Sequence, residues 1–302
     1  ANYFGFIHIA SPTIPFLGKT RLTIIYPLAV PVIVAVFCNT TNMLEGYNGE
    51  GSGTCLIASC FLVLCALIWN SAEGFFFSLI SISVLVPFWL YNRYPAKVFP
   101  GDVGTLTMGA MAASIALMGY LEVADFCAFL IHIFNSFYVL ISVRGFFESQ
   151  ELQEEKSDIL LLDDDTIKAS DQKDATLSLP RLILAKGPLS EPGLVRRFYW
   201  ISVICGFFAI VATLFMAWTM KELELTLIFL VILILLIPTI LIVYKFPRIL
   251  GVVLLMVILL VFGIVFLILA EMFIMQRIEG SIDLYFISVP LNLIAISVIL
   301  AP

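Results

Sequence analysis

Two stretches of the chain combine glycines with side chains that can bind a cation or a phosphate. The first, residues 40–53 (TTNMLEGYNGEGSG), places four glycines within eight residues. Glycines let a backbone approach a ligand closely. Oxygen atoms of the kind that hard cations prefer are offered by Asn42, Glu45, Asn48 and Glu50. The spacing is not that of a phosphate-binding P-loop or an EF-hand, so a flexible connection between helices is an equally good interpretation.

The second stretch, residues 91–109 (YNRYPAKVFPGDVGTLTMG), places Asp102 between two glycines where a new apolar block begins. The Asp102 carboxylate can cap the free N–H groups of a helix starting there, which is the simpler interpretation, or it can bind a cation. Arg93 and Lys97 add groups that pair with phosphate, although each can equally lie at a membrane interface. The second stretch therefore predicts a site for a cation and a phosphate.

The elements that must position these residues are membrane helices. Of the 302 residues, 61% are hydrophobic and only 13% are charged, which is too little polar surface for a water-soluble protein. The net charge of −6, without a basic stripe, argues against nucleic acid. Uncharged blocks of about 20 residues predict an all-α fold, a polytopic transmembrane helix bundle of about nine spans. The predicted spans lie near 22–39, 54–70, 74–90, 105–120, 124–142, 199–219, 224–244, 249–271 and 284–300.

This arrangement places three polar segments on one face of the membrane. They are the loops near 40–53 and 91–104 and the acidic segment 143–198, so we expect them to converge on one site. Twelve of the 16 basic residues fall on this face, which the positive-inside rule assigns to the cytoplasm. Eight of the twelve lie in the long segment, where that rule is weaker.

The segment 143–198 is predicted to be one long extramembrane loop. Residues 148–175 show no sustained apolar periodicity, which favours an irregular or strand-containing excursion. The run Asp163–Asp165 lies within it and is interpreted as a solvated group of charges.

Taken together and in this order, the two glycine-containing stretches resemble the polyprenyl-phosphate N-acetylhexosamine-1-phosphate transferase family. The family motif N-x-x-x-G-x-(D/N)-G is matched by Asn42, Gly46, Asn48 and Gly49. Its motif P-(A/S)-x-V-F-x-G-D-x-G is matched by Pro95, Ala96, Val98, Phe99, Gly101, Asp102 and Gly104. Residues 134–138 and 176–191 resemble the eukaryotic and archaeal branch, the dolichyl-phosphate N-acetylglucosamine phosphotransferases. The histidine-rich motif of the bacterial branch is absent, since the only histidines are His8 and His132.

The resemblance implies a reaction. N-acetylglucosamine-1-phosphate would pass from UDP-N-acetylglucosamine to a polyprenyl or dolichyl phosphate, with release of UMP. Asp102 and Asn42 would be the catalytic residues and would hold Mg²⁺. The residues expected to contact or frame the substrate are Phe99 near the uracil ring, Gly46 and Asn48 at the nucleoside, Asn92 beneath the loop, and Arg144 at the sugar phosphate. For Arg144, anchoring at the membrane interface is the simpler explanation.

The resemblance covers residues 1–220, a transferase-like membrane core whose loop 143–198 is expected in the cytoplasm. Residues 221–302 stand outside it as additional C-terminal transmembrane helices, and the family's Asp-Asp motif with its preceding helices is expected ahead of residue 1. We expect an integral membrane protein of the endoplasmic reticulum or of a prokaryotic plasma membrane, with the nucleotide sugar and the lipid phosphate as partners. Whether the chain forms a homodimer is left open by the sequence. Two other functions also stay open: a non-catalytic homologue that binds nucleotide sugar or lipid as a partner subunit, and a transporter.

Overall fold

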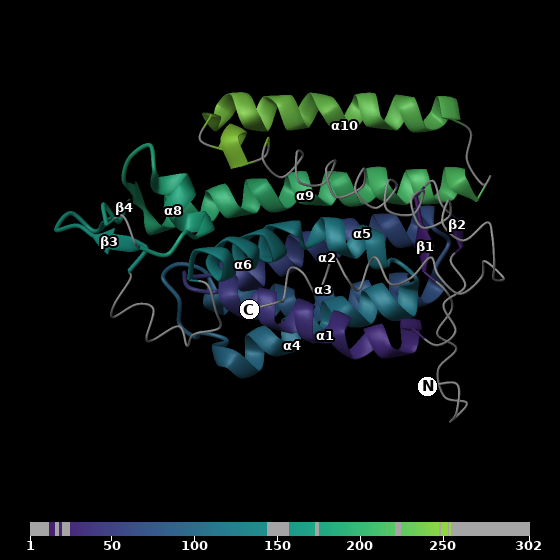
Figure 1. Cartoon of the computed structure of the whole chain (residues 1–302), viewed down its shortest axis with the longest axis horizontal. Coiled ribbons are helices and arrows are strands. Elements are labelled where there is room, and N and C mark those ends of the chain that lie inside the picture. Colours follow the sequence, from purple (N-terminus) through teal and green to yellow (C-terminus); the bar gives the residue numbers. More distant parts are fainter. Residues whose placement is uncertain are drawn as a thin grey trace, which may run out of the picture.

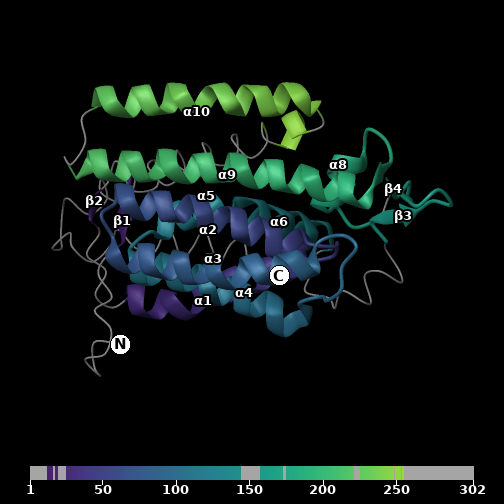
Figure 2. The same ribbon diagram turned by 180° about the vertical axis from the view of Figure 1, so that it is seen from behind.

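The computed structural model describes residues 12–15, 18–19, 25–143, 157–172, 175–220, 225–247, 249–252 and 254. Arg144 and residues 255–302 lie outside this part of the chain. In chain order the elements are β1 (Thr13–Ile14), β2 (Gly18–Lys19), α1 (Ile25–Leu44), α2 (Glu50–Ile68), α3 (Ala72–Asn92), α4 (Gly101–Gly119), α5 (Glu122–Ala128), α6 (Leu130–Val143), β3 (Ile159–Leu161), β4 (Thr166–Ala169), α8 (Leu179–Leu184), β5 (Leu189–Ser190), α9 (Glu191–Thr219) and α10 (Leu225–Lys245). The long helices run side by side along one direction, and α10 lies next to α9 (Figures 1 and 2).

Four of these helices, α2, α3, α4 and α9, are long and apolar enough to cross a membrane. They confirm the predicted spans near 54–70, 74–90, 105–120 and 199–219, and the chain is an integral membrane protein. Helices α1 and α10 coincide with the predicted spans near 22–39 and 224–244, but their searched parts, Ala29–Leu44 and Leu233–Lys245, are shorter. The last two predicted spans lie almost entirely outside the described residues. The described residues thus give four spans, or five with the bent pair α5–α6, and the number nine is not confirmed.

The predicted span 124–142 is not one straight helix. Helices α5 and α6 meet at an angle of 69° around Phe129. The Phe129 backbone leaves the helical region (φ −93°, ψ 11°), and its buried ring packs edge-on against Phe37 and stacks on His132. Neither glycine nor proline marks the break. The bend depends on packing between distant helices, which the pattern of apolar residues does not show.

Small residues allow the helices to approach closely. A β-carbon added to Gly109 of α4 would lie 2.4 Å from the α-carbon of Cys38 in α1. At the C-terminal end of α4, a β-carbon on Gly119 would lie 2.7 Å from the α-carbon of Gly74 in α3. Such contacts are typical of helix packing in membranes, where apolar burial contributes little and close backbone contact contributes much. Helix α4 is therefore held between α1 and α3.

The segment 143–198 corrects the all-α prediction, because its described part forms a small antiparallel sheet. Strands β3, β4 and β5 lie in that order, with Leu160 opposite Lys168 and Ile167 opposite Leu189. The exposed run Asp163–Asp165 is the turn between β3 and β4, as a solvated group of charges should be. Together with α8, this sheet lies beyond one end of the helix bundle, whereas β1 and β2 lie at the opposite end (Figures 1 and 2).

The guanidinium of Arg181 holds the extramembrane segment together. From α8 it donates hydrogen bonds to the backbone carbonyls of Ser170 (3.2 Å), Gln172 (2.7 Å) and Ala175 (2.5 Å). An arginine has five N–H donors in a planar fork and can satisfy several carbonyls at once. The described residues on both sides of positions 173–174, between β4 and α8, are therefore bound to one side chain.

Candidate active site

Three of the segments singled out in the sequence meet at one end of the bundle, and Asn48 joins them. Its backbone N–H donates to Oε1 of Glu191 at 2.7 Å, and its side-chain Nδ2 donates to the same oxygen. Its Oδ1 accepts a hydrogen bond of 2.7 Å from the backbone N–H of Ala96. The loop between α1 and α2, the loop between α3 and α4, and the first residue of α9 are thus in direct contact, as the expected convergence on one face requires.

The side-chain amide of Asn48 has only one possible orientation. The Glu191 carboxylate can only accept a hydrogen bond, and the Ala96 N–H can only donate one. The nitrogen of Asn48 must therefore face Glu191, and its oxygen must face Ala96.

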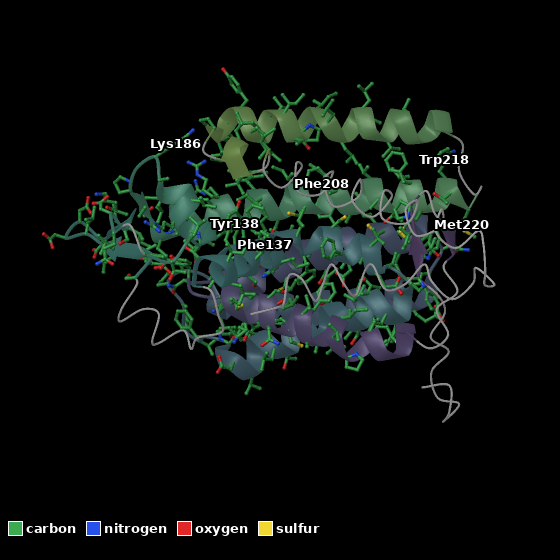
Figure 3. All side chains as sticks on the ribbon, viewed as in Figure 1. Phe137, Tyr138, Lys186, Phe208, Trp218 and Met220 are labelled. Carbon is green, nitrogen blue, oxygen red and sulfur yellow. The ribbon has the colours of Figure 1, made fainter. Side chains whose placement is uncertain are left out.

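The labelled side chains in Figure 3 show which end of α9 this is. Lys186 lies by α8, at the end of α9 that begins with Glu191, and Trp218 and Met220 lie at the other end. Tyr138, late in α6, is on the Lys186 side. Tyr138 and Lys186, from the two later stretches that resemble the family, therefore lie toward the end of the molecule where Asn48 contacts Glu191.

Two carboxylates brace the loop between α1 and α2 from opposite sides. Glu45, which follows α1, accepts a hydrogen bond of 2.7 Å from the N–H of Gly51. Glu50, the first residue of α2, accepts one of 3.1 Å from the N–H of Gly46. Burial raises the pKa of the Glu45 carboxyl to about 7, and the bond from Gly51 offsets part of that rise. The two side chains thereby close the loop on itself.

The turn at Gly49 is fixed by its neighbours. Gly49 has a φ of +78°, in the region that favours glycine, and an added β-carbon would lie 2.9 Å from the α-carbon of Arg93. Its carbonyl accepts a hydrogen bond of 2.6 Å from the hydroxyl of Tyr199, which in turn accepts one of 2.9 Å from the indole of Trp89. Gly46 differs: it is exposed, and apart from its chain neighbours no atom of the described residues lies within 4 Å of where a β-carbon would be.

Asn92 lies beneath the loop between α3 and α4. It ends α3, is completely buried, accepts a hydrogen bond of 2.6 Å from the Ser52 hydroxyl and donates one of 2.9 Å to the carbonyl of Val98. Both of its polar groups therefore have protein partners. The structure gives Asn92 the task of supporting the loop, and substrate contact by Asn92 stays a prediction.

Asp102 and Phe99 face outward at the start of α4. Asp102 lies in the first turn, is exposed, and forms no ion pair or side-chain hydrogen bond with any described residue. The N-cap position is Pro100, without a side-chain cap, so Asp102 does not cap the helix by a hydrogen bond. The ring of Phe99 is 55% exposed. Arg93 and Lys97, also exposed, lie over the rings of Trp89 and Tyr91, respectively.

Asn42 is brought beside the start of α4 by Thr105. The Thr105 hydroxyl donates a hydrogen bond of 2.5 Å to Oδ1 of Asn42 in the last turn of α1. Thr105 is one turn beyond Asp102, and its hydroxyl also lies 3.1 Å from the Asp102 carbonyl oxygen. The two residues predicted to hold a metal are thus linked through one side chain.

The donor set fits a magnesium ion that also binds a substrate. Mg²⁺ in phosphoryl-transfer sites is commonly held by one or two protein oxygens together with substrate phosphates and water. One exposed carboxylate and one amide oxygen match that pattern. No group of three or more His, Cys, Asp or Glu side chains able to hold a metal occurs among the described residues, so this part of the chain offers no complete metal cage of its own.

Sequence reasoning missed four residues that position the site: Ser52, Thr105, Tyr199 and Glu191. Glu191 ended a stretch that resembled the family, but its contact with Asn48 spans 143 positions of sequence. Asn135, in α6, joins α1 to α8 by donating to the carbonyl of Met43 and accepting from the N–H of Leu179. The predicted substrate contact Arg144 lies outside the described residues.

Comparison with known proteins agrees with the resemblance seen in the motifs. Residues 1–120 match glycosyl transferase family 4. A protein of Methanocaldococcus jannaschii named as a candidate glycosyltransferase is 33% identical over 199 residues, which are 66% of this chain and 64% of the relative. A protein of Sulfolobus acidocaldarius named as a candidate UDP-N-acetylglucosamine–dolichyl-phosphate N-acetylglucosaminephosphotransferase is 39% identical over 122 residues, 39% of this chain and 37% of the relative.

The bacterial branch is also similar. A phospho-N-acetylmuramoyl-pentapeptide-transferase of Clostridium acetobutylicum is 32% identical over 120 residues, 39% of this chain and 38% of the relative. The chain spans less than two thirds of the length of each of these relatives. The region that matches the family, residues 1–120, contains both motif stretches.

Proposed function

We propose that this chain, whose residues 1–120 match glycosyl transferase family 4, takes part in the transfer of N-acetylglucosamine-1-phosphate from UDP-N-acetylglucosamine to a polyprenyl or dolichyl phosphate. The names of the archaeal relatives support this reaction. An oxygen of the lipid phosphate attacks the β-phosphorus of the nucleotide sugar. The bond from that phosphorus to the oxygen bridging the two phosphates breaks, and UMP leaves with the electron pair.

The residues at the end of the bundle have separate tasks in this proposal. Mg²⁺, when bound, neutralises negative charge on the diphosphate as the bond to UMP breaks. Asp102 and Asn42 would hold it. Phe99 offers an exposed ring against which the uracil can stack, and Gly46 leaves space for the nucleoside beside the loop that Asn48 fixes.

The observation that carries the proposal is the state of Asp102. Its carboxylate is exposed and has no partner among the described residues, whereas the side chains of Asn42, Asn48 and Asn92 are each hydrogen-bonded to other protein groups. Because no described residue pairs with it and it does not cap α4 by a hydrogen bond, the Asp102 carboxylate is available to a cation. Asp102 lies one turn before Thr105, whose hydroxyl contacts Asn42, the other residue predicted to bind the metal.

The test is a transfer reaction with the purified protein in phospholipid nanodiscs, UDP-N-acetylglucosamine, dolichyl phosphate and Mg²⁺. We expect UMP release and formation of a lipid-linked diphosphate, both dependent on Mg²⁺. The variant Asp102→Asn keeps the size of the side chain but loses its charge, and we expect it to slow transfer by about 10²-fold or more. Asp163→Asn, which changes an exposed aspartate in the β3–β4 turn, is the matched control and should transfer at the normal rate.

The other functions give different results in the same experiment. A transporter would move the nucleotide sugar across sealed vesicles without forming lipid-linked product. A non-catalytic homologue would bind UDP-N-acetylglucosamine but release no UMP. Undiminished transfer by Asp102→Asn would contradict the metal-binding role of Asp102.

We also propose that the site faces the cytoplasm, because the basic residues are concentrated on its side of the membrane. Labelling of a single cysteine at position 163, in a variant without the six native cysteines, would report the side on which the β3–β4 turn lies. Labelling by an impermeant reagent from outside intact cells would contradict this sidedness.

A further inference from the structure

Thr105 has more hydrogen-bond acceptors within reach than it has protons. It is buried, with 2% of its surface exposed. Its hydroxyl oxygen lies 2.5 Å from Oδ1 of Asn42, 3.2 Å from the carbonyl oxygen of Gly101 and 3.1 Å from that of Asp102. A hydroxyl has one proton to donate but can also accept. Only one of the three oxygens can receive that proton at a time.

Two arrangements of the contact between Asn42 and Thr105 therefore satisfy the hydroxyl. In the first, which the structure shows, Thr105 donates to Oδ1 of Asn42. In the second, the Asn42 amide is turned by about 180°, its Nδ2 donates to Thr105, and the Thr105 proton goes to a carbonyl of its own helix. The second arrangement turns the amide oxygen of Asn42 away from Thr105, where it can bind a cation.

We propose that Thr105 is a positioning residue that holds the Asn42 amide beside Asp102 and accepts its N–H group when the amide oxygen turns to a divalent cation. This inference rests on the proposed function, because it assumes a cation at Asp102. Thr105 itself touches neither the cation nor the substrate. It acts by giving Asn42 a partner in both orientations, so that binding the cation leaves neither the amide nor the hydroxyl unpaired.

Two features of α4 support a specific role for this hydroxyl. Thr107, two positions along the same helix, makes an ordinary hydrogen bond of 2.6 Å to the carbonyl of Val103 and is exposed. Thr105 instead faces α1 at the point where its oxygen meets Asn42. The close approach of α1 and α4 at Gly109, one turn further on, fixes the distance between the two helices there.

The experiment measures Mn²⁺ binding to the purified protein in nanodiscs in the presence of UDP, by electron paramagnetic resonance of free Mn²⁺. Thr105→Val is nearly the same size but cannot form a hydrogen bond, and we expect it to weaken Mn²⁺ binding about three- to tenfold. Thr105→Ser keeps the hydroxyl and should bind as the wild type does. Thr107→Val is the matched control on the same helix and should also bind normally.

A double-mutant cycle tests whether Thr105 acts through Asn42. If it does, Thr105→Val should have no further effect on Mn²⁺ binding once Asn42→Ala is present. Equal binding by Thr105→Val and wild type would overturn the inference, and so would an undiminished effect in the Asn42→Ala background. A lowered midpoint of thermal unfolding for Thr105→Val that Thr107→Val and Thr105→Ser lack, with normal Mn²⁺ binding, would show a merely structural role and also overturn it.

Failure of the proposed function gives a different pattern. If Asp102→Ala binds Mn²⁺ as the wild type does, the cation is not held at Asp102 and both proposals are overturned. If Asp102→Ala loses Mn²⁺ binding while Thr105→Val keeps it, only the inference about Thr105 is overturned. If the wild type shows no saturable Mn²⁺ binding with UDP, both proposals are overturned.

Discussion

Asn48 and Asn42 belong to the same glycine-rich stretch, yet the protein holds them in opposite ways. The amide of Asn48 lies between a carboxylate and a backbone N–H, whose polarities permit one orientation. The amide of Asn42 meets the hydroxyl of Thr105, which can donate or accept. Asn48 is therefore a fixed part of the scaffold, and Asn42 is adjustable. The type of residue is the same, and the partners decide what it can do.

The side-chain amide of Asn92 is held in a single orientation, like that of Asn48. The carbonyl of Val98 can only accept a hydrogen bond, so the Asn92 nitrogen must face it, and the Asn92 oxygen takes the proton of Ser52. Both fixed asparagines join segments distant in sequence, Asn48 from within the loop between α1 and α2 and Asn92 from a completely buried position at the end of α3. We infer that the end of the bundle consists of a rigid frame around a small adjustable part, Asn42 with Thr105 and Asp102.

The largest expected effect on stability comes from Asn48→Ala. The change removes a hydrogen bond to a charged carboxylate and leaves the N–H of Ala96 without its acceptor, so we expect a loss of about 3 kcal/mol in the free energy of unfolding. Thermal unfolding in detergent, followed by tryptophan fluorescence, is the measurement. The control is Asn39→Ala, which changes an exposed asparagine in α1 whose side chain, among the described residues, donates to the carbonyl of Ala35 in its own helix. Equal unfolding temperatures for the two variants would remove the distinction between fixed and adjustable asparagines.

Asn92→Ala should have the next largest effect, about 2 kcal/mol, because two neutral hydrogen bonds are lost at a completely buried position. Ser52→Ala removes one of those bonds and should lose about half as much. We expect limited proteolysis to show faster cleavage between α3 and α4 in Asn92→Ala, since the loop loses its bond at Val98. Unchanged cleavage there would mean that Asn92 does not support the loop.

The sequence predicted the positions of the motifs but not the contacts that make them a site. That Asp102 begins a helix follows from a change of composition at Gly101, and the shared face of the three segments follows from counting spans. The bond between Asn48 and Glu191 could not be predicted, because it depends on how α9 packs against α2. The bend at Phe129 was missed for the same reason, and for the small sheet the sequence indicated only a strand-containing excursion within residues 148–175, not the pairing of β3, β4 and β5. Local patterns indicate elements, whereas the pairing of elements depends on the whole bundle.

Glu45 gives the frame a dependence on pH. The folded protein binds the Glu45 proton more tightly than the unfolded chain, with a pKa of about 7 against an ordinary value of 4.5. This contribution to stability is fully present below about pH 4.5 and is lost as the pH rises through about 7, with a slope of up to about 1.4 kcal/mol per pH unit. Glu45→Gln keeps an acceptor for the Gly51 N–H but cannot ionise. We expect its unfolding temperature to fall less than that of the wild type between pH 5 and 7.

The measured quantity is the difference in unfolding temperature between the wild type and Glu45→Gln at each pH. A difference is needed because Glu50 and other carboxylates contribute pH dependences of their own. If the unfolding temperatures of the wild type and Glu45→Gln change in parallel between pH 5 and 7, Glu45 does not titrate in this range. A steeper curve for the variant would show that the Glu45 charge stabilises the loop.

Asn42→Ala should have the smallest effect on stability, below about 1 kcal/mol, because Thr105 can give its proton to the carbonyl of Gly101 or Asp102 instead. Its effect on function should be much larger: we expect transfer to need a higher Mg²⁺ concentration for half-maximal rate. Thermal unfolding and the Mg²⁺ dependence of UMP release, measured on the same preparation, separate the two effects. An Asn42→Ala variant as unstable as Asn48→Ala would place Asn42 in the rigid frame. A stable variant with normal Mg²⁺ dependence would instead remove Asn42 from the metal site while leaving the frame of Asn48 and Asn92 intact.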